Sequence, residues 1–295
     1  MPQHQPERVT AADLADVLLR GRNADGGWGY YPEKSSRLEP TAWATLALRE
    51  TAGAADAPAV LTQWPSKDGL LLERAGGGPN YAFLGLALLV MRACQIEHHT
   101  GNALLLGGLQ GVKGMALAPS THSRQDNALQ GWSWIADTFS WVEPTAWCLL
   151  SLKKWAKRPG ERVDAQRLDE AERLLIDRSC LNGGWNYGNS NMLGQELKPY
   201  VPTTAAALLA MQDRRDHPVV ERSLNYLESA ATSERSGIAL ALALLALRAC
   251  GRGHEAVQAA LHEQLPRTVE LGNHAAIALA VCALSPQRIH AAFTL

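Results

Sequence analysis

The chain has 295 residues, of which 46% are hydrophobic and 19% are charged. This composition excludes a disordered protein, and the length suits one large domain or a repeat array that closes on itself. Lys and Arg (28 residues) balance Asp and Glu (29 residues) to a net charge of -1, with no basic block. The sequence therefore predicts no nucleic-acid partner.

Two kinds of helical segment alternate along the chain. Six are amphipathic, with charged residues between apolar ones at helical spacing: Ala12–Gly21, Ala57–Trp64, Asn102–Leu109, Asp164–Ser179, Pro218–Ala230 and Glu255–Gln264. Six are apolar on nearly every side, which is typical of buried helices: Thr41–Arg49, Tyr81–Cys94, Thr145–Trp155, Thr203–Met211, Ser236–Cys250 and Asn273–Leu284. We expect an all-α fold, an (α/α)6 toroid of six helical hairpins with an inner apolar ring and an outer amphipathic ring, as a single domain over residues 1–295.

A short phrase recurs between these segments. A glycine and tryptophan motif stands at residues 25–30 (Asp-Gly-Gly-Trp-Gly-Tyr), 131–134 (Gly-Trp-Ser-Trp) and 182–187 (Asn-Gly-Gly-Trp-Asn-Tyr). A Pro-Thr motif follows it at residues 39–43 (Glu-Pro-Thr-Ala-Trp), 143–147 (the same five residues) and 201–205 (Val-Pro-Thr-Thr-Ala). A unit that recurs in this way cannot bury its own apolar face alone, so the fold must be a stack of copies.

Three of the apolar helices carry a proline at their start. We expect Pro40, Pro144 and Pro202 at the first helical position, where the missing N–H is not needed. Glu39 and Glu143 are then expected at the cap, where the helix dipole favours a negative charge.

These motifs resemble the prenyltransferase/squalene-oxidase repeat of squalene-hopene cyclases, class II terpene cyclases and prenyltransferase β-subunits. The resemblance implies the toroid and an isoprenoid substrate. The family's glutamine six residues before the tryptophan is replaced here by Arg22, Asp126 and Ser179. The zinc-binding Asp, Cys and His of the prenyltransferases have no counterpart, so no metal site is predicted.

Glu143 is the candidate acid. The Asp-x-Asp-Asp-Thr-Ala motif of class II cyclases, whose middle Asp protonates the substrate, is in register with residues 141–146, and Glu143 stands at the middle Asp. Helix capping is the favoured alternative, because it stabilises the charged carboxylate and lowers its pKa. As an acid, Glu143 needs a second carboxylate, which either Asp137 or Asp126, further back in the same loop, can supply by folding over it. Glu39 is a further catalytic candidate, although its identical context in the other copy favours capping.

Aromatic residues are the candidates for substrate binding, because π faces stabilise carbocations. They lie at the starts of apolar helices or in the inserted loops near residues 111–140 and 186–201: Trp43, Tyr81, Trp132, Trp134, Phe139, Trp141, Trp147 and Tyr200. Loops of this length are usually functional or mobile. For the cluster in the first loop, ligand contact and packing are equally supported.

Three functions stay open. The first is an enzyme that cyclises or isomerises an isoprenoid by acid-initiated carbocation chemistry in an aromatic-lined cavity. The second is an isoprenoid-binding or structural toroid without chemistry. The third is a carbohydrate-active toroid, in which Glu39 and Glu143 supply the two carboxylates across a cleft.

Cofactors and partners follow from the same pattern. No cofactor is expected, except Mg²⁺ if the substrate is a diphosphate. The expected ligand is a small hydrophobic isoprenoid, while peripheral membrane contact, a partner domain and a homo-oligomer stay open. The five cysteines form no CxxC pair and lie in apolar segments, which indicates reduced thiols and a cytoplasmic protein.

Overall fold

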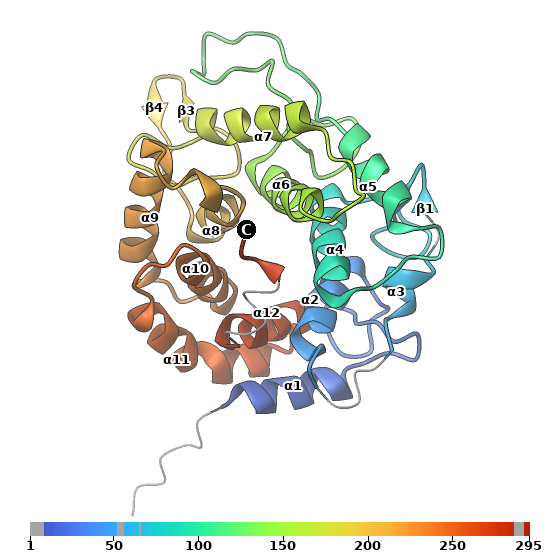
Figure 1. Ribbon diagram of the computed structural model, residues 1–295. Helices are drawn as coiled ribbons and strands as arrows, with labels where there is room; N and C mark the ends of the chain where they lie inside the picture. Colours follow the sequence, from blue (N-terminus) through green and yellow to red (C-terminus); the bar gives the residue numbers. More distant parts are fainter. Residues whose placement is uncertain (1–8, 52–55, 65, 286–291) are drawn as a thin grey trace, which may run out of the picture.

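The computed structural model describes residues 9–51, 56–64, 66–285 and 292–295, whose helices form two concentric rings (Figure 1). The inner ring consists of the apolar helices α2 (Leu38–Leu48), α4 (Tyr81–Cys94), α6 (Val142–Ala156), α8 (Val201–Ala210), α10 (Gly237–Ala249) and α12 (His274–Leu284). Each of these helices packs against the next, and α12 packs against α2, so the ring closes. The predicted toroid is confirmed.

The amphipathic helices form the outer ring. They are α1 (Ala11–Arg20), α3 (Ala59–Thr62), α5 (Asn102–Gly111), α7 (Ala165–Asp177), α9 (Pro218–Ala231) and α11 (Glu255–Leu271). Each turns its apolar side to one or two inner helices, which buries apolar surface between the rings. The predicted segments agree with these helices, although α3 has only 4 residues and α11 extends beyond the predicted Gln264.

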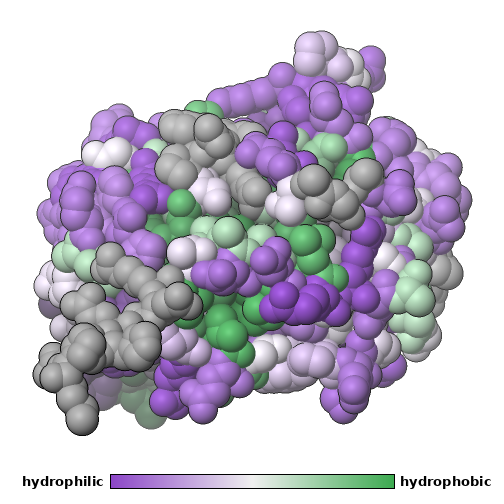
Figure 2. All heavy atoms as spheres, turned by 90° about the horizontal axis from the view of Figure 1, so that it is seen from below, coloured by the Kyte–Doolittle hydropathy of each residue, from purple (hydrophilic) through white to green (hydrophobic). Residues whose placement is uncertain are grey.

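Two of the loops that lead to inner helices contain short β-hairpins. The hairpin of β1 (Ser66–Lys67) and β2 (Leu70–Leu71) precedes α4, and the hairpin of β3 (Asn191–Met192) and β4 (Gln195–Glu196) precedes α8. A single turn of 3-10 helix, η1 (Gln212–Arg214), follows α8. Seen from below, the side of the ring that carries α1 and α11 is mostly polar, with hydrophobic residues exposed near its middle (Figure 2). Among the described residues, none of the helices combines the length and apolar character that crossing a bilayer requires.

The repeated tryptophans join the two rings. The indole N–H donates to a carbonyl in the last part of the preceding outer helix: Trp28 to Leu18 (2.7 Å), Trp132 to Leu109 (2.9 Å) and Trp185 to Leu175 (2.6 Å). The backbone N–H of each tryptophan donates to a threonine hydroxyl of the following inner helix: Thr41 (2.9 Å), Thr145 (3.0 Å) and Thr204 (2.9 Å). The motif therefore satisfies one of the free carbonyls that every helix end leaves.

The expected positions of the prolines and glutamates at the helix starts are wrong. Helices α2 and α6 begin one residue before the glutamates, so Glu39 and Glu143 are second residues, and the caps are Arg37 and Trp141, whose side chains make no cap bond. The reason lies in the loops, because the backbone N–H of each cap residue is held by the carbonyl of a repeat tryptophan, at 2.9 Å in both copies. Pro40 and Pro144 are third residues and Pro202 is a second residue, positions where the N–H also lacks a partner within the helix.

Candidate active site

The starts of the inner helices meet at one end of the ring. The first N–H of α2, α4 and α6 donates to a carbonyl of the loop before the next inner helix: Leu38 to Glu73, Tyr81 to Trp134 and Val142 to Tyr187. The start of α12 is bound in the same way to the loop before α2, by His274 N–H to Tyr30 O at 2.8 Å. Side chains at these helix starts therefore share one mouth of the central channel.

Glu39 and Glu143 lie at this mouth, on α2 and α6, the two neighbours of α4 in the ring. Both side chains are half-buried. The Tyr30 hydroxyl donates a hydrogen bond to Glu39, and the Trp43 side chain also bonds this carboxylate. Among the described residues, the hydrogen bond that bears on the carboxyl of Glu143 comes from Trp147. The two glutamates thus occupy equivalent helix positions, but Glu39 accepts a tyrosine hydrogen bond in addition to the one from its tryptophan.

The two carboxyl groups have different electrostatic surroundings. Burial and then the negative charge of Glu39 raise the pKa of Glu143 to about 7. Burial also raises the pKa of Glu39, opposed by its hydrogen bond from Tyr30, and the charges that act on it are those of Glu73 and Arg37. The Tyr30 hydrogen bond favours the ionised form of Glu39, and the negative charge of Glu39 acts on Glu143, which keeps its proton up to about pH 7. The expectation that a helix start would lower the pKa of Glu143 is therefore wrong, because desolvation outweighs the helix dipole.

An aromatic cluster lies one helical turn beyond the carboxyl groups. The rings of Trp43 and Trp147 meet edge to face, with centroids 5.7 Å apart. Phe293 stacks on Trp43 at 5.8 Å and meets Trp147 at 6.5 Å. We call these three residues the aromatic triad. Trp43 and Trp147 are only 3% and 4% exposed, so the triad fills the channel at this depth.

The two inserted loops enclose a second aromatic site at the same end of the ring, over the starts of α6 and α8. This loop pocket has a volume of about 270 Å³. Phe139 and Trp141 stack at 4.8 Å, and Tyr187 and Tyr200 lie 5.3 Å apart. Phe139, Tyr187 and Tyr200 remain 43%, 49% and 49% exposed, which is unusual for large apolar side chains. The polar lining includes Lys198.

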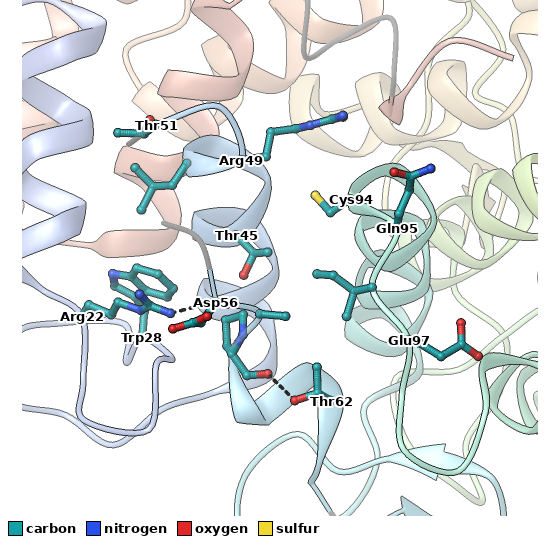
Figure 3. Close-up of a pocket in the computed structure, with 14 residues that line it drawn as sticks. Arg22, Trp28, Thr45, Arg49, Thr51, Asp56, Thr62, Cys94, Gln95 and Glu97 are labelled. Carbon is teal, nitrogen blue, oxygen red and sulfur yellow. Dashed lines mark hydrogen bonds between the residues drawn. The ribbon is translucent and has the colours of Figure 1, made fainter. Parts of the chain in front are cut away.

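A cavity larger than the loop pocket lies elsewhere. It has a volume of about 600 Å³ and is lined by the C-terminal ends of α2 and α4, including Arg49 and Gln95, together with Arg22 and Asp56 (Figure 3). The side chain of Arg22 donates to the backbone carbonyl of Asp56 at 2.8 Å. Because Glu39 lies at the other end of α2, this cavity is separate from the paired carboxyl groups.

Some predicted site residues lie outside both sites. Trp132 is fully buried, where its indole anchors α5 and the Arg167 guanidinium covers its ring at 3.5 Å. Asp137 is exposed, and its charge acts on Tyr81 rather than on Glu143. The predicted pairing of Asp137 with Glu143 is therefore wrong. Asp137 itself has a left-handed backbone conformation, with φ of 59°, and the loop turns its side chain outward.

Two predicted aromatics line the start of α4. Tyr81, its first residue, is 7% exposed. Trp134 is half-buried and packs edge to face on Phe83 at 6.0 Å. Their proposed contact with substrate stays a prediction.

Four residues that the structure places in the two sites are absent from the sequence-based set: Tyr30, Tyr187, Lys198 and Phe293. Tyr30 had a signal, because each repeat tryptophan is followed two positions later by an aromatic residue, here Tyr30, Trp134 and Tyr187. Phe293 had none, because it lies beyond the last repeat and reaches Trp43 and Trp147 only through the tertiary fold.

Solved structures match this architecture. Two structures of the type II terpene cyclase MstE from Scytonema, each a substitution variant in complex with geranylgeranyl dihydroxybenzoate (substrate), align over 96% of both chains. Their sequence identities are 13% and 14%, with TM-scores of 0.55 and 0.57. The apo structure of MstE aligns over 88% of this chain and 77% of its own, with 16% identity and a TM-score of 0.52.

This chain has the fold of the type II terpene cyclases. No family model matches the sequence, and no curated protein is similar to it. The terpene-cyclase-like fold therefore shows in the arrangement of the helices, with only 13–16% sequence identity to the solved structures.

Proposed function

We propose that this protein binds an isoprenoid and cyclises it by acid-initiated carbocation chemistry, with Glu143 as the proton donor. One observation carries the proposal: a carboxyl group with a pKa of about 7 lies at the channel mouth, one helical turn from the aromatic triad. A general acid works best when its pKa is near the working pH. The match of the fold to terpene cyclases crystallised with an isoprenoid substrate supports the choice of ligand.

The reaction begins with proton transfer. The proton moves from the carboxyl oxygen of Glu143 to an alkene carbon of the substrate, and the alkene electrons form the new C–H bond. The cation left on the neighbouring carbon is attacked by the next alkene, which closes a ring. Loss of a proton from the last cation restores the carboxyl group of Glu143. The product is therefore an isomer of the substrate.

The other residues of the mouth stabilise charge. Glu39 supplies a fixed negative charge near the developing cation. Trp43 and Trp147 offer π faces, which attract cations by about 0.5–2 kcal/mol each. The hydrogen bond from the Tyr30 hydroxyl favours the charged form of Glu39 against the effect of burial.

The loop pocket suits a planar group at the other end of the substrate. Its aromatic walls can stack on a ring, and Lys198 can face a carboxylate. The ligand of the structural neighbours, geranylgeranyl dihydroxybenzoate, has both a prenyl chain and a planar acidic ring. We extend this substrate class, a prenylated aromatic acid, to the present chain.

Mass spectrometry of protein incubated with geranylgeranyl dihydroxybenzoate, geranylgeraniol or squalene tests the proposal. The expected result is a cyclised product of unchanged mass, which disappears in Glu143→Gln although the ligand still binds. Binding without conversion in either protein would leave a lipid-binding toroid. Absence of binding, combined with hydrolysis of oligosaccharides that depends on Glu39 and Glu143, would favour the carbohydrate-active alternative.

A further inference from the structure

The residues Ala292–Leu295 lie inside the inner ring, where Figure 1 shows the C-terminal end of the chain at the centre. Ala292 and Phe293 are fully buried. The Phe293 ring lies against both channel tryptophans, at 5.8 Å from Trp43 and 6.5 Å from Trp147. Since α2 and α6 are both neighbours of α4 but not of each other, Phe293 packs against two inner helices that are separated by a third.

Polar groups at the C-terminal ends of the inner helices hold this segment in place. The Gln212 amide, which is 4% exposed, donates to Phe293 O at 2.6 Å and accepts from Leu295 N–H at 3.0 Å. The Lys154 ammonium donates to Thr294 O at 2.7 Å. The segment is thus bound at the end of the channel opposite Glu39 and Glu143, with its phenyl ring directed at the tryptophans.

We infer that Phe293 sets the depth of the substrate site. It is a positioning residue that acts through Trp43 and Trp147: its ring supports the two indoles from behind, so that the triad closes the channel one turn beyond the carboxyl groups. The length of prenyl chain that reaches Glu143 is then limited by the height of the triad. This inference rests on the proposed isoprenoid ligand, but it holds whether or not the ligand is converted.

The size of the phenyl ring makes the inference quantitative. A phenyl group and one isoprene unit are of similar size, and an apolar cavity left by a large-to-small substitution takes up apolar molecules of that size. Removal of the ring lets the indoles move toward the vacated space and deepens the site by about one isoprene unit. Burial of each additional CH₂ group favours binding by about 0.8 kcal/mol, so a gain of at least about tenfold for the longer chain is expected after the cavity cost is offset.

Binding of farnesol and geranylgeraniol to the full chain, measured by isothermal titration calorimetry, tests this. In Phe293→Ala the ratio of the two dissociation constants is expected to shift at least about tenfold toward geranylgeraniol. Phe83→Ala is the matched control, because it removes a phenyl ring from the pair with Trp134 instead. Phe293→Leu keeps most of the side-chain volume, so a smaller shift of the ratio, about threefold, is expected. This variant serves as the test if Phe293→Ala does not fold.

An unchanged ratio in both Phe293 variants, with both alcohols still binding, would overturn the role of Phe293 and leave the proposed function standing. The same shift in Phe83→Ala would also overturn it, because the effect would then be a general loosening. If neither alcohol binds the unmodified protein, the isoprenoid ligand and this inference fail together. If the ratio shifts but Glu143→Gln changes no product, the chemistry fails and the depth-setting role stands.

Discussion

Two regions of this molecule carry the same five residues, Glu-Pro-Thr-Ala-Trp, at the starts of α2 and α6, yet their carboxyl groups accept different hydrogen bonds. In both, the tryptophan one turn later bonds the glutamate and joins the aromatic triad. The difference comes from the preceding loop. Two positions after its repeat tryptophan, the first copy has Tyr30, which donates to Glu39, whereas the second has Trp134, which packs on Phe83.

The comparison shows how a repeat can supply two chemical roles from one motif. A donated hydrogen bond favours the ionised form of a carboxyl group, here that of Glu39. Its charge then helps to raise the pKa of Glu143, which keeps the proton. Division of roles between two nearby carboxyl groups of unequal environment is a general way to produce an acid near neutral pH.

The largest expected effect separates the two glutamates. Glu143→Gln keeps the shape but removes the acidic proton, so turnover is expected to fall at least about 100-fold. Glu39→Gln removes only a stabilising charge, and we expect a fall of about tenfold. Steady-state rates on a converted substrate check both values. Equal losses in the two variants would mean that the carboxyl groups act as one unit, and the proposed division of roles would be wrong.

The pH dependence follows from the raised pKa of Glu143. The active form is protonated, so the rate is expected to fall about tenfold per pH unit above about pH 7. The free energy of unfolding is also expected to fall as the pH rises. The folded pKa of about 7 exceeds the ordinary value of 4.5, so this stabilisation is complete below pH 4.5 and is lost as the pH rises to about 7. Thermal unfolding between pH 4.5 and 8 should show this decline, and Glu143→Gln should flatten it.

Tyr30→Phe makes the first copy more like the second. Loss of the hydroxyl donor raises the pKa of Glu39 further, so less negative charge remains to raise that of Glu143. We expect the alkaline limb of the rate profile to move below pH 7, with a loss of about threefold to tenfold in turnover at pH 7. Tyr226→Phe is the control, because that hydroxyl donates to Pro199 O in a different part of the ring. A profile unchanged from that of the unmodified protein would contradict the role of Tyr30.

The smallest expected effect on catalysis concerns the repeat tryptophans, which both copies share. Trp28→Phe and Trp132→Phe each leave a helix carbonyl without its indole donor, at Leu18 and Leu109. Each is expected to lower the free energy of unfolding by about 1–3 kcal/mol, measured by urea denaturation, with no change in the pH profile. A changed pH profile in Trp132→Phe alone would show that this tryptophan does contribute to the second carboxyl site.

The sequence by itself determined the architecture. Apolar and amphipathic helices alternate, and a helix apolar on all sides must be enclosed by others, so two rings followed from composition and periodicity. The sequence also gave the candidates Glu39, Glu143, Trp43 and Trp147, because the repeat places them at equivalent helix starts.

Only the tertiary structure decided the chemistry of those candidates. The pKa of Glu143 depends on desolvation and on Glu39, which lies 104 positions earlier in the chain and on another inner helix. Sequence distance favours a pairing of Glu143 with Asp137, but nearness along the chain does not fix where a loop side chain turns. Phe293 joined the triad because ring closure brings a segment outside every repeat to the channel axis, and no local pattern records such a long-range contact.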